Sequence, residues 1–347
     1  MENKIQSKTY AYFAAANGYS GFRSYFNGVF NPTKYSRLFI LKGGPGTGKS
    51  TLMRELYDKY KENGVYAEMI YCSSDTSSLD GVILESEKGR IAVIDGTAPH
   101  STDPIYPGCI DEIVNLGEYW NGDTLSKERV KIEELTKEKK SAYNRAYSFL
   151  SLAGKCSNEI DTAILDAFED RGVLNRVFLG TDNFKLVDSF GKDGLYELDT
   201  LVNIASSVVG VVGVWNSDQA YLKNLISMYS TSDVVIFPSV FSDSKIKAVY
   251  IKSEDIAYIS SPSESINTKT IIDASDLLNH KKIKSIEPYL EKVAGIKESL
   301  LWHSSDEFKK ASNAHFMLED IYKSVMDFSR LKDVKEKMVQ KISNILF

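Results

Sequence analysis

The feature that most constrains the fold is a glycine-rich loop between an apolar run and an amphipathic segment, in residues 37–54, RLFILKGGPGTGKSTLMR. Leu38–Leu41 predicts a strand, and the residues from Ser50 onward predict a helix that ends at Gly64. Between them the sequence matches the pattern G-x-x-x-x-G-K-[ST]. Because glycines leave the backbone N–H groups accessible, such a loop can wrap around a phosphate chain, and the helix N-terminus adds its positive dipole end.

The loop predicts a site for ATP and Mg²⁺. Lys49 is expected to reach the β- and γ-phosphates, and the hydroxyl of Ser50 is expected to bind Mg²⁺. No Asn/Thr-Lys-x-Asp tetrapeptide, the guanine-reading motif of GTPases, occurs in the chain, so ATP is the nucleotide expected. The alternative is a glycine-rich turn that binds nothing. The residues expected to contact the nucleotide are Gly43, Gly44, Pro45, Gly46, Thr47, Gly48, Lys49, Ser50 and Thr51.

A magnesium-supporting acid is expected at the end of a buried strand beside the loop. Arg90–Asp95, RIAVID, is an apolar run that ends in an acid, so Asp95 is predicted to support Mg²⁺ together with Ser50. Residue 96 is glycine, so the acid pair typical of AAA-type motors is missing. A carboxylate that activates water must therefore come from elsewhere or not exist. The alternative for Asp95 is an ordinary turn aspartate.

Asp75 and His100 are the candidates for contacting the γ-phosphate or the attacking water. Both follow predicted strand ends, at the sheet edge where ligands collect in open α/β proteins. Asp75 lies in a serine-rich loop, SSDTSS, where a turn or capping role is the alternative. For His100 the alternative is a hydrogen bond to a loop carbonyl. Asp111 and Glu112 are expected in the first turn of a helix over Cys109–Tyr119, where they complement the helix dipole.

The sequence also contains an internal repeat. Residues 66–99 and 232–264 share the succession of an apolar strand, a Ser/Asp-rich loop, a short strand and another apolar strand, and 12–26 pairs with 177–190. Two helical tails match as well, at an offset of 158 residues. There Ile132, Leu135, Tyr143, Leu150, Ala153 and Ile160 fall on Leu290, Val293, Leu301, Phe308, Ala311 and Leu318.

The second copy of the loop has lost its phosphate-binding residues. At an offset of 170 residues, VVGVVGVWNSDQAYL (208–222) aligns with the strand, loop and helix start of the first copy. An acid at position 218 would repel a triphosphate, so the second half is predicted not to bind nucleotide. In this alignment Asn216, Asp218, Gln219 and Ala220 replace Gly46, Gly48, Lys49 and Ser50, and at an offset of 165 Ser260 replaces Asp95.

These observations predict an α/β fold with two tandem P-loop NTPase-like domains, each a mostly parallel sheet flanked by helices and followed by a helical extension. The first extension includes one long helix, Ser126–Ala153, and in the second a helix is expected to start at Pro288. The extensions are candidate surfaces for a protein partner or a homo-oligomer. The predicted domains are residues 1–172, with the extension at about 121–172, and residues 173–347, with the extension at about 281–347.

Composition narrows the class of protein. With a net charge of −5 the chain has no overall basic field, so no nucleic-acid partner is expected. Three widely separated cysteines form no C-x-x-C pair, which fits a reducing compartment. The start of the chain has no apolar signal segment, and the longest apolar run, Leu201–Trp215, is shorter than the ~20 residues of a membrane span. A cytoplasmic protein with no membrane association is therefore expected.

Three segments, KGGPGTGKSTLMREL, SSDTSSLDGVILE and IAVIDGTAPHSTDPIYPGCIDEIVNLGEYW, occur in this order and resemble a family of poorly characterised bacterial tandem P-loop ATPases. That family is found largely in spore-forming Firmicutes, and some members are labelled nucleotide kinases. The resemblance covers nearly the whole chain and implies a fold and a nucleotide ligand. Both halves commonly carry a P-loop in that family, whereas the second half departs from the pattern here. Only Gly43–Thr51, Asp95 and His100 therefore correspond to its motifs.

The function expected is Mg²⁺-dependent hydrolysis of ATP at one site in the first half, with Lys49 and Asp95 stabilising the charge that develops on the γ-phosphate. The second half is expected to be a non-catalytic docking or regulatory partner. One alternative is a small-molecule or nucleotide kinase in which Asp75 or Asp103 accepts a hydroxyl proton, although the scattered arginines form no lid-like cluster. The other is a nucleotide-gated binding module with negligible turnover, which the missing acid after Asp95 keeps open.

Overall fold

The computed structural model divides the chain into two compact units that are not contiguous in sequence. Unit 1 contains Ser24–Tyr143 and Phe308–Phe347 together with the residues up to Ala14, and unit 2 contains Ala15–Arg23 and Asn144–Glu307. The predicted domain boundary after residue 172, and the first part of the repeat segment 177–190, lie outside the described residues. The structure describes residues 10–168, 185–242, 244–264 and 266–347.

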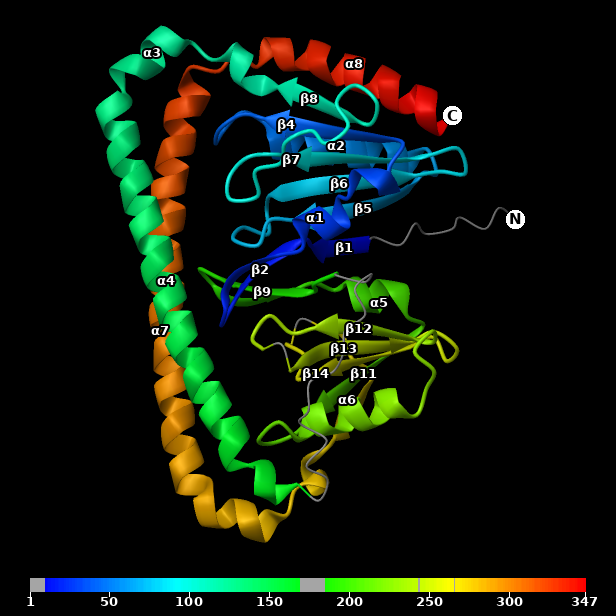
Figure 1. The fold of residues 1–347 in the computed structure, drawn as a ribbon, viewed down its shortest axis with the longest axis vertical. Helices are drawn as coiled ribbons and strands as arrows, with labels where there is room; N and C mark the ends of the chain where they lie inside the picture. Colours follow the sequence, from blue (N-terminus) through cyan, green and yellow to red (C-terminus); the bar gives the residue numbers. More distant parts are fainter. Residues whose placement is uncertain (1–9, 169–184, 243, 265) are drawn as a thin grey trace. The chain divides into compact units, whose positions relative to one another are not determined.

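Unit 1 is built on a six-stranded mixed sheet in the order β1-β5-β6-β7-β4-β8 (Figure 1). Strand β6 is antiparallel to both of its neighbours, and the pairs β1/β5, β7/β4 and β4/β8 are parallel. Strand β4 therefore lies between two strands parallel to it, and its carboxyl end lies beside the carboxyl end of β7. The strands are β1 (Tyr10–Phe13), β4 (Arg37–Lys42), β5 (Tyr66–Tyr71), β6 (Leu79–Glu85), β7 (Arg90–Asp95) and β8 (Asp111–Asn115).

Unit 2 contains a five-stranded sheet in the order β12-β13-β14-β11-β15. The pairs β12/β13 and β13/β14 are antiparallel, and the pairs β14/β11 and β11/β15 are parallel. This is the order and the direction pattern of β5-β6-β7-β4-β8, so the repeat in the sequence is matched by a repeat in sheet topology. The strands are β11 (Ser207–Val212), β12 (Val234–Pro238), β13 (Ile246–Ile251), β14 (Ile256–Ser260) and β15 (Thr270–Asp273).

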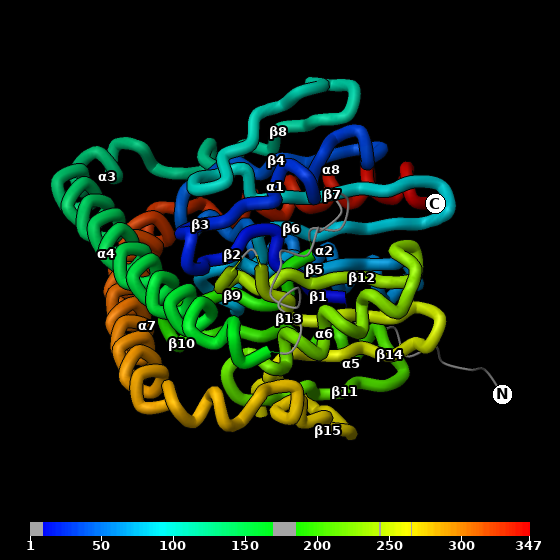
Figure 2. The backbone as a smooth tube through the Cα atoms, turned by 60° about the horizontal axis from the view of Figure 1, so that its bottom comes forward, coloured from blue at the N-terminus to red at the C-terminus, as the bar shows by residue number. Residues whose placement is uncertain are grey.

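Shorter strands and the helices complete the described chain (Figure 2). Two small two-stranded sheets pair β2 (Ala15–Gly18) with β3 (Gly21–Ser24) and β9 (Asp188–Gly191) with β10 (Gly194–Glu197). Within the described ranges, no helix has the length and apolar character that crossing a membrane requires. The α-helices are α1 (Phe26–Val29), α2 (Lys49–Glu62), α3 (Gly122–Lys127), α4 (Arg129–Ala163), α5 (Thr200–Ile204), α6 (Ser217–Ser227), α7 (His280–Ser324) and α8 (Ser329–Leu346).

The core of unit 1 contains α2 and α8 packed against the sheet. Helix α2 buries Leu52, Met53, Leu56, Tyr57 and Tyr60 at helical spacing. Helix α8 adds a stripe of side chains four residues apart to the same core, and each such buried side chain contributes about 1.5–3 kcal/mol of transfer free energy. The last helix of the chain is therefore part of the core that contains the glycine-rich loop's own helix. The α8 stripe consists of Met338, Ile342 and Leu346.

The helix predicted over Cys109–Tyr119 is wrong. Asp111–Asn115 forms the edge strand β8, and Leu116–Tyr119 forms a 3₁₀ turn. The side chain of Asp111 accepts hydrogen bonds from the backbone N–H groups of Ile105 and Tyr106, each at 2.6 Å, so it braces a loop instead of complementing a helix dipole. The parallel pairing with β4 determines the strand, and this partner lies far away in sequence.

The predicted helix start at Pro288 is also wrong, because α7 begins at His280 and continues through the proline. Proline in a helix interior removes one backbone hydrogen bond and costs ~3 kcal/mol. The flanking residues Ile283 and Leu290 are buried in a cluster with Ile160 of α4 and its neighbours, and this packing offsets the loss. The first long helix, predicted over Ser126–Ala153, is divided into α3 and α4, and α4 extends ten residues further, to Ala163.

Candidate functional site

The glycine-rich loop joins the carboxyl end of β4 to the start of α2, as the sequence predicts. Gly46 has φ +72° and Gly48, the residue before the helix, has φ +82°, which is a backbone conformation that favours glycine. These two glycines let the chain turn sharply between the strand and the helix. The loop therefore has the left-handed turns that a nest of backbone N–H groups needs.

Lys49 and Asp95 lie together at this loop. The ammonium group of Lys49 donates hydrogen bonds to the carbonyl oxygens of Gly43 (2.6 Å) and Gly44 (2.8 Å). Its Nζ atom also lies 3.5 Å from Oδ2 of Asp95, and the two side chains are only 10% and 16% exposed. In the sheet, Asp95 is the register partner of Leu41 in β4, so parallel pairing brings the acid to the lysine.

Ser50 and Asp95 offer oxygen atoms suitable for Mg²⁺. Ser50 Oγ accepts a hydrogen bond from the backbone N–H of Leu79 at 2.9 Å, so its position is fixed by the first residue of β6. Asp95 Oδ1 accepts from the backbone N–H and hydroxyl of Thr97, at 2.9 and 2.5 Å, which orients Oδ2. The described residues contain no group of three or more His, Cys, Asp or Glu side chains placed to hold a metal. An ion carried in with nucleotide phosphates needs fewer protein ligands, and these two residues fit it.

The side chain of His100 is buried at this end of the sheet and is held by an acid that the sequence pattern does not single out. Its Nε2 lies 3.5 Å from Oδ1 of Asp80, with side chains 6% and 8% exposed, and its ring stacks on Phe26 at 4.5 Å. Burial lowers the pKa of His100, but the hydrogen bond and charge of Asp80, with Asp95, outweigh it, so the pKa is raised. The position of Asp80 at the start of β6 is the sequence signal that could have identified it. Because β6 is antiparallel to β7, it begins at the sheet edge where β7 ends.

Asp75 occupies a turn. Its Oδ1 atom accepts hydrogen bonds from the backbone N–H (3.0 Å) and the hydroxyl (2.7 Å) of Ser77. These bonds use the carboxylate as an Asx-turn acceptor, which is the alternative interpretation of this residue. Asp75 lies in the loop between β5 and β6, at the same end of the sheet as Asp80 and His100.

Atoms of the C-terminal helices α7 and α8, and the ring of Trp120, lie close to the glycines of the loop. A Cβ atom placed on Gly46 would lie 2.8 Å from the carbonyl oxygen of Glu319 and 2.8 Å from Cγ of Lys323. One placed on Gly44 would lie 3.1 Å from the ring of Trp120, and one placed on Gly48 would lie 3.0 Å from a leucine of α8. The sequence pattern places these helices in the second half of the chain and does not predict this contact.

The equivalent position in unit 2 is filled by hydrogen-bonded side chains. Asn216, which replaces Gly46, has φ +61°, so the left-handed turn is kept. Gln219, which replaces Lys49, is 5% exposed and donates from Nε2 to Ser260 Oγ at 2.8 Å and to the carbonyl of Ile246 at 3.0 Å. Its Oε1 accepts from the backbone N–H of Ile246 at 2.8 Å, and the Ser260 hydroxyl donates to Asp218. The Lys49–Asp95 ion pair is thus replaced by an uncharged Gln219–Ser260 contact.

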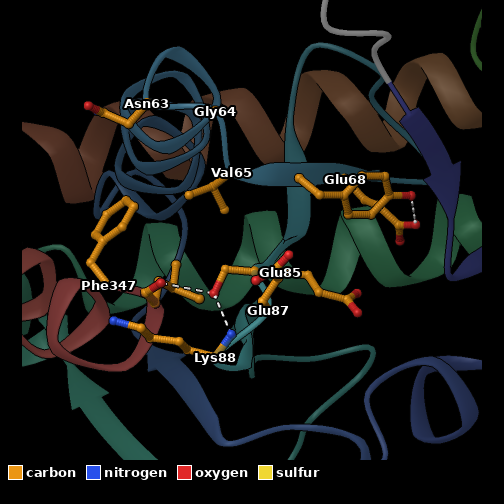
Figure 3. Close-up of a pocket in the computed structure, with 11 residues that line it drawn as sticks. Asn63, Gly64, Val65, Glu68, Glu85, Glu87, Lys88 and Phe347 are labelled. Carbon is orange, nitrogen blue, oxygen red and sulfur yellow. Dashed lines mark hydrogen bonds between the residues drawn. The ribbon is translucent and has the colours of Figure 1, made fainter.

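A groove of about 880 Å³ in unit 1 lies away from the loop (Figure 3). Its lining includes Val65 and Glu68 near the start of β5, Glu85 at the end of β6, and Phe347. These positions are at the opposite end of the strands from the glycine-rich loop. The groove is therefore not part of the candidate site.

Comparison of the chain with family models, curated proteins and solved structures gave no match. The function proposed below is therefore inferred from residues of this chain alone. They form a glycine-rich loop with a lysine, a neighbouring acid and a serine hydroxyl at one sheet edge, and a buried His100–Asp80 pair at the same end of the sheet. Such a set can hold a polyphosphate with its metal ion and stabilise negative charge on it.

Proposed function

We propose that the chain binds Mg·ATP at Gly43–Thr51 of unit 1 and hydrolyses it. The observation that carries this proposal is the loop itself, which joins a parallel strand to a helix through left-handed Gly46 and Gly48 and places Lys49 3.5 Å from Asp95. This arrangement supports two P-loop NTPase-like domains in tandem, the second of them degenerate. The repeated strand order of unit 2 supports the same view.

The chemistry follows from the residues present. The loop N–H groups and Lys49 hold the β- and γ-phosphates and stabilise the negative charge that spreads over them during reaction. Ser50 and Asp95 would hold Mg²⁺, which when bound neutralises phosphate charge. Water forms a P–O bond to the γ-phosphorus while the bond to the β-phosphate oxygen breaks, and the water proton is released. His100, paired with Asp80 at this end of the sheet, would hydrogen-bond the phosphate or the water.

A binding module with negligible turnover is the second candidate. It is favoured by the absence of an acid after Asp95, where the next residue is Gly96, and by the engagement of Asp75 in a turn. If the chain is such a binding module, ATP binding would change how the helical extension of unit 1 contacts a protein partner or a second copy of this chain. The cytoplasmic location and the absence of a nucleic-acid partner remain parts of the proposal that follow from composition.

Calorimetry and phosphate release test the proposal. Titration with a non-hydrolysable ATP analogue and Mg²⁺ should give one nucleotide per chain, because unit 2 has Gln219 in place of the lysine. Lys49→Ala should abolish both binding and phosphate release, whereas Lys59→Ala on the exposed face of α2 should leave both unchanged. A stoichiometry near two, or full binding by the Lys49→Ala protein, would contradict the assignment.

Phosphate release then separates the two candidates. Hydrolysis predicts free phosphate from ATP without any acceptor. The binding module predicts tight ATP binding without release. Release or transfer only when an acceptor is added would indicate a phosphotransferase instead.

A further inference from the structure

In unit 1 the first part of α4 packs against the last part of α7. Leu135 of α4 is buried with Ala314 and Leu318 of α7, and the Tyr143 ring meets the Phe308 ring edge-on at 5.8 Å. Figures 1 and 2 both show the two helices side by side here. These contacts fix which residues of one helix face the other.

Lys139 lies between these two contacts on α4. It is one helical turn from Leu135 and one from Tyr143, so all three project from the same side of the helix. The Tyr143 hydroxyl is hydrogen-bonded to Ser74 in the loop before β6, so this side of α4 reaches the candidate site.

Lys139 is half-buried, and among the described residues it has no acidic partner and no hydrogen-bond acceptor. Burial lowers the pKa of its ammonium group. Placing a cation there without a partner costs free energy, and an incoming anion would recover it.

His315 of α7 brings a second basic group to the same place. Its Nε2 lies 3.8 Å from Oε1 of Glu319. Burial lowers the pKa of His315, and the charges of Lys139 and Lys49 lower it further, against the opposing effect of Glu319. The charges of Lys49 on α2 and Lys139 on α4 thus act on His315 on α7. Lys323 pairs with the other carboxylate oxygen of Glu319, at 2.9 Å.

The face of α7 that carries these residues lies on the glycine-rich loop. His315, Glu319 and Lys323 follow one another at intervals of four residues, so they form one stripe on the helix. A Cβ atom placed on Gly46 would lie closest to the carbonyl oxygen of Glu319 and to the stem of Lys323. The stripe therefore faces the loop.

We propose that Lys139 and His315 bind the γ-phosphate of the nucleotide held by the glycine-rich loop. The two helices then supply, from within the same chain, the positive charge that an arginine finger supplies in other phosphate-transferring proteins. This inference rests on the proposed nucleotide site. It concerns only the terminal phosphate, which distinguishes ATP from ADP.

The test compares the affinities of variants for a non-hydrolysable ATP analogue and for ADP, each with Mg²⁺. Lys139→Met keeps the length and apolar stem of the side chain and should weaken binding of the ATP analogue about 10- to 100-fold, with ADP binding unchanged within about twofold. The matched control is Lys140→Met, which removes the adjacent exposed lysine and should bind both ligands like the wild type. Lys139→Arg keeps the charge and should retain most of the selectivity for ATP.

His315→Gln tests the same site from α7 and should also lower affinity for the ATP analogue selectively. Without nucleotide, Lys139→Met should be at least as stable as the wild type, because the buried charge is removed; circular dichroism on heating checks this. The proposal would be overturned if a variant lost affinity equally for the ATP analogue and for ADP. It would also be overturned if Lys139→Met, or if His315→Gln, lost no affinity for the ATP analogue. If the wild type binds nucleotide and Lys49→Ala does not, such a result refutes this inference alone. No binding by the wild type refutes the proposed function and this inference with it.

Discussion

Gln219→Ala is expected to destabilise unit 2 without changing nucleotide affinity. Gln219 is buried and makes four hydrogen bonds, two with the backbone of Ile246, one with Ser260 and one with Asp218. Alanine removes all four and leaves the N–H group of Ile246 buried without an acceptor. The expected effect therefore lies in the stability of unit 2 and not in ligand binding.

The size of the loss follows from these contacts. A hydrogen bond contributes a net ~0.5–1.5 kcal/mol, and a buried group left without its partner costs about 1–3 kcal/mol. Because the alanine cavity is small and polar groups partly re-pair through Asp218 and Ser260, the free energy of unfolding of unit 2 should fall by about 2–4 kcal/mol.

Urea unfolding followed by the fluorescence of Trp215 measures this change. Trp215 packs against the apolar cluster of unit 2, just before the start of α6. Replacing Trp120 and Trp302 by phenylalanine leaves it as the only tryptophan, because the chain contains three. A single-unit probe is needed, since a chain with two units need not unfold in one step.

Nucleotide affinity is measured separately, in the background with all tryptophans. Gln340→Ala, on the exposed face of α8, is the control and should shift neither quantity. An unchanged urea midpoint would show that the hydrogen bonds of Gln219 contribute nothing. A fall in ATP affinity in a folded Gln219→Ala protein would show that the degenerate site takes part in nucleotide binding.

Two further variants test backbone strain and a buried charge. Gly46→Ala should lower the melting temperature more than Gly64→Ala does. Both glycines have positive φ, so alanine costs ~1–2 kcal/mol of backbone strain at either position, but only the methyl group at position 46 would meet the Glu319 carbonyl. Equal shifts in melting temperature would contradict this packing. Burial raises the pKa of Asp188 to about 7, and the charge of Lys247 opposes this rise only in part. Because this carboxyl ionises more readily in the unfolded chain, its ionisation lowers the free energy of unfolding progressively between about pH 4 and pH 7. Asp188→Asn should therefore equal the wild type in stability near pH 4 and exceed it above about pH 7 in urea unfolding, and a pH-independent difference would contradict this assignment.

The sequence was sufficient for the loop and for Asp95 because their determinants are local. The strand, the glycines and the start of α2 are contiguous, and Asp95 ends an apolar run that pairs directly with β4. The alignment of the second loop was informative for the same reason: β4 and β11 begin 170 residues apart, at Arg37 and Ser207. The left-handed Asn216 in place of Gly46 agrees with it.

The rest of the site depends on long-range packing that residue patterns do not show. Asp80 joins His100 only because β6 runs antiparallel between β5 and β7. Lys139 lies within electrostatic reach of His315 only because α4 and α7 pack together, although a charged residue on a long helix normally marks a solvated face. The edge strand over Asp111–Asn115 has few buried side chains, so its pattern resembled the first turn of a helix.

The division of the chain into units has a consequence for the order in which the protein is made. Unit 1 is interrupted after Tyr143 and resumes at Phe308, so nearly all of unit 2 is synthesised before the residues that complete unit 1. Domains generally fold as units during synthesis, with N-terminal ones first. Here the glycine-rich loop leaves the ribosome early, but its neighbours Glu319 and Lys323, and the α8 part of its core, come last. The proposed nucleotide site is thus completed only after nearly all of unit 2 has been synthesised.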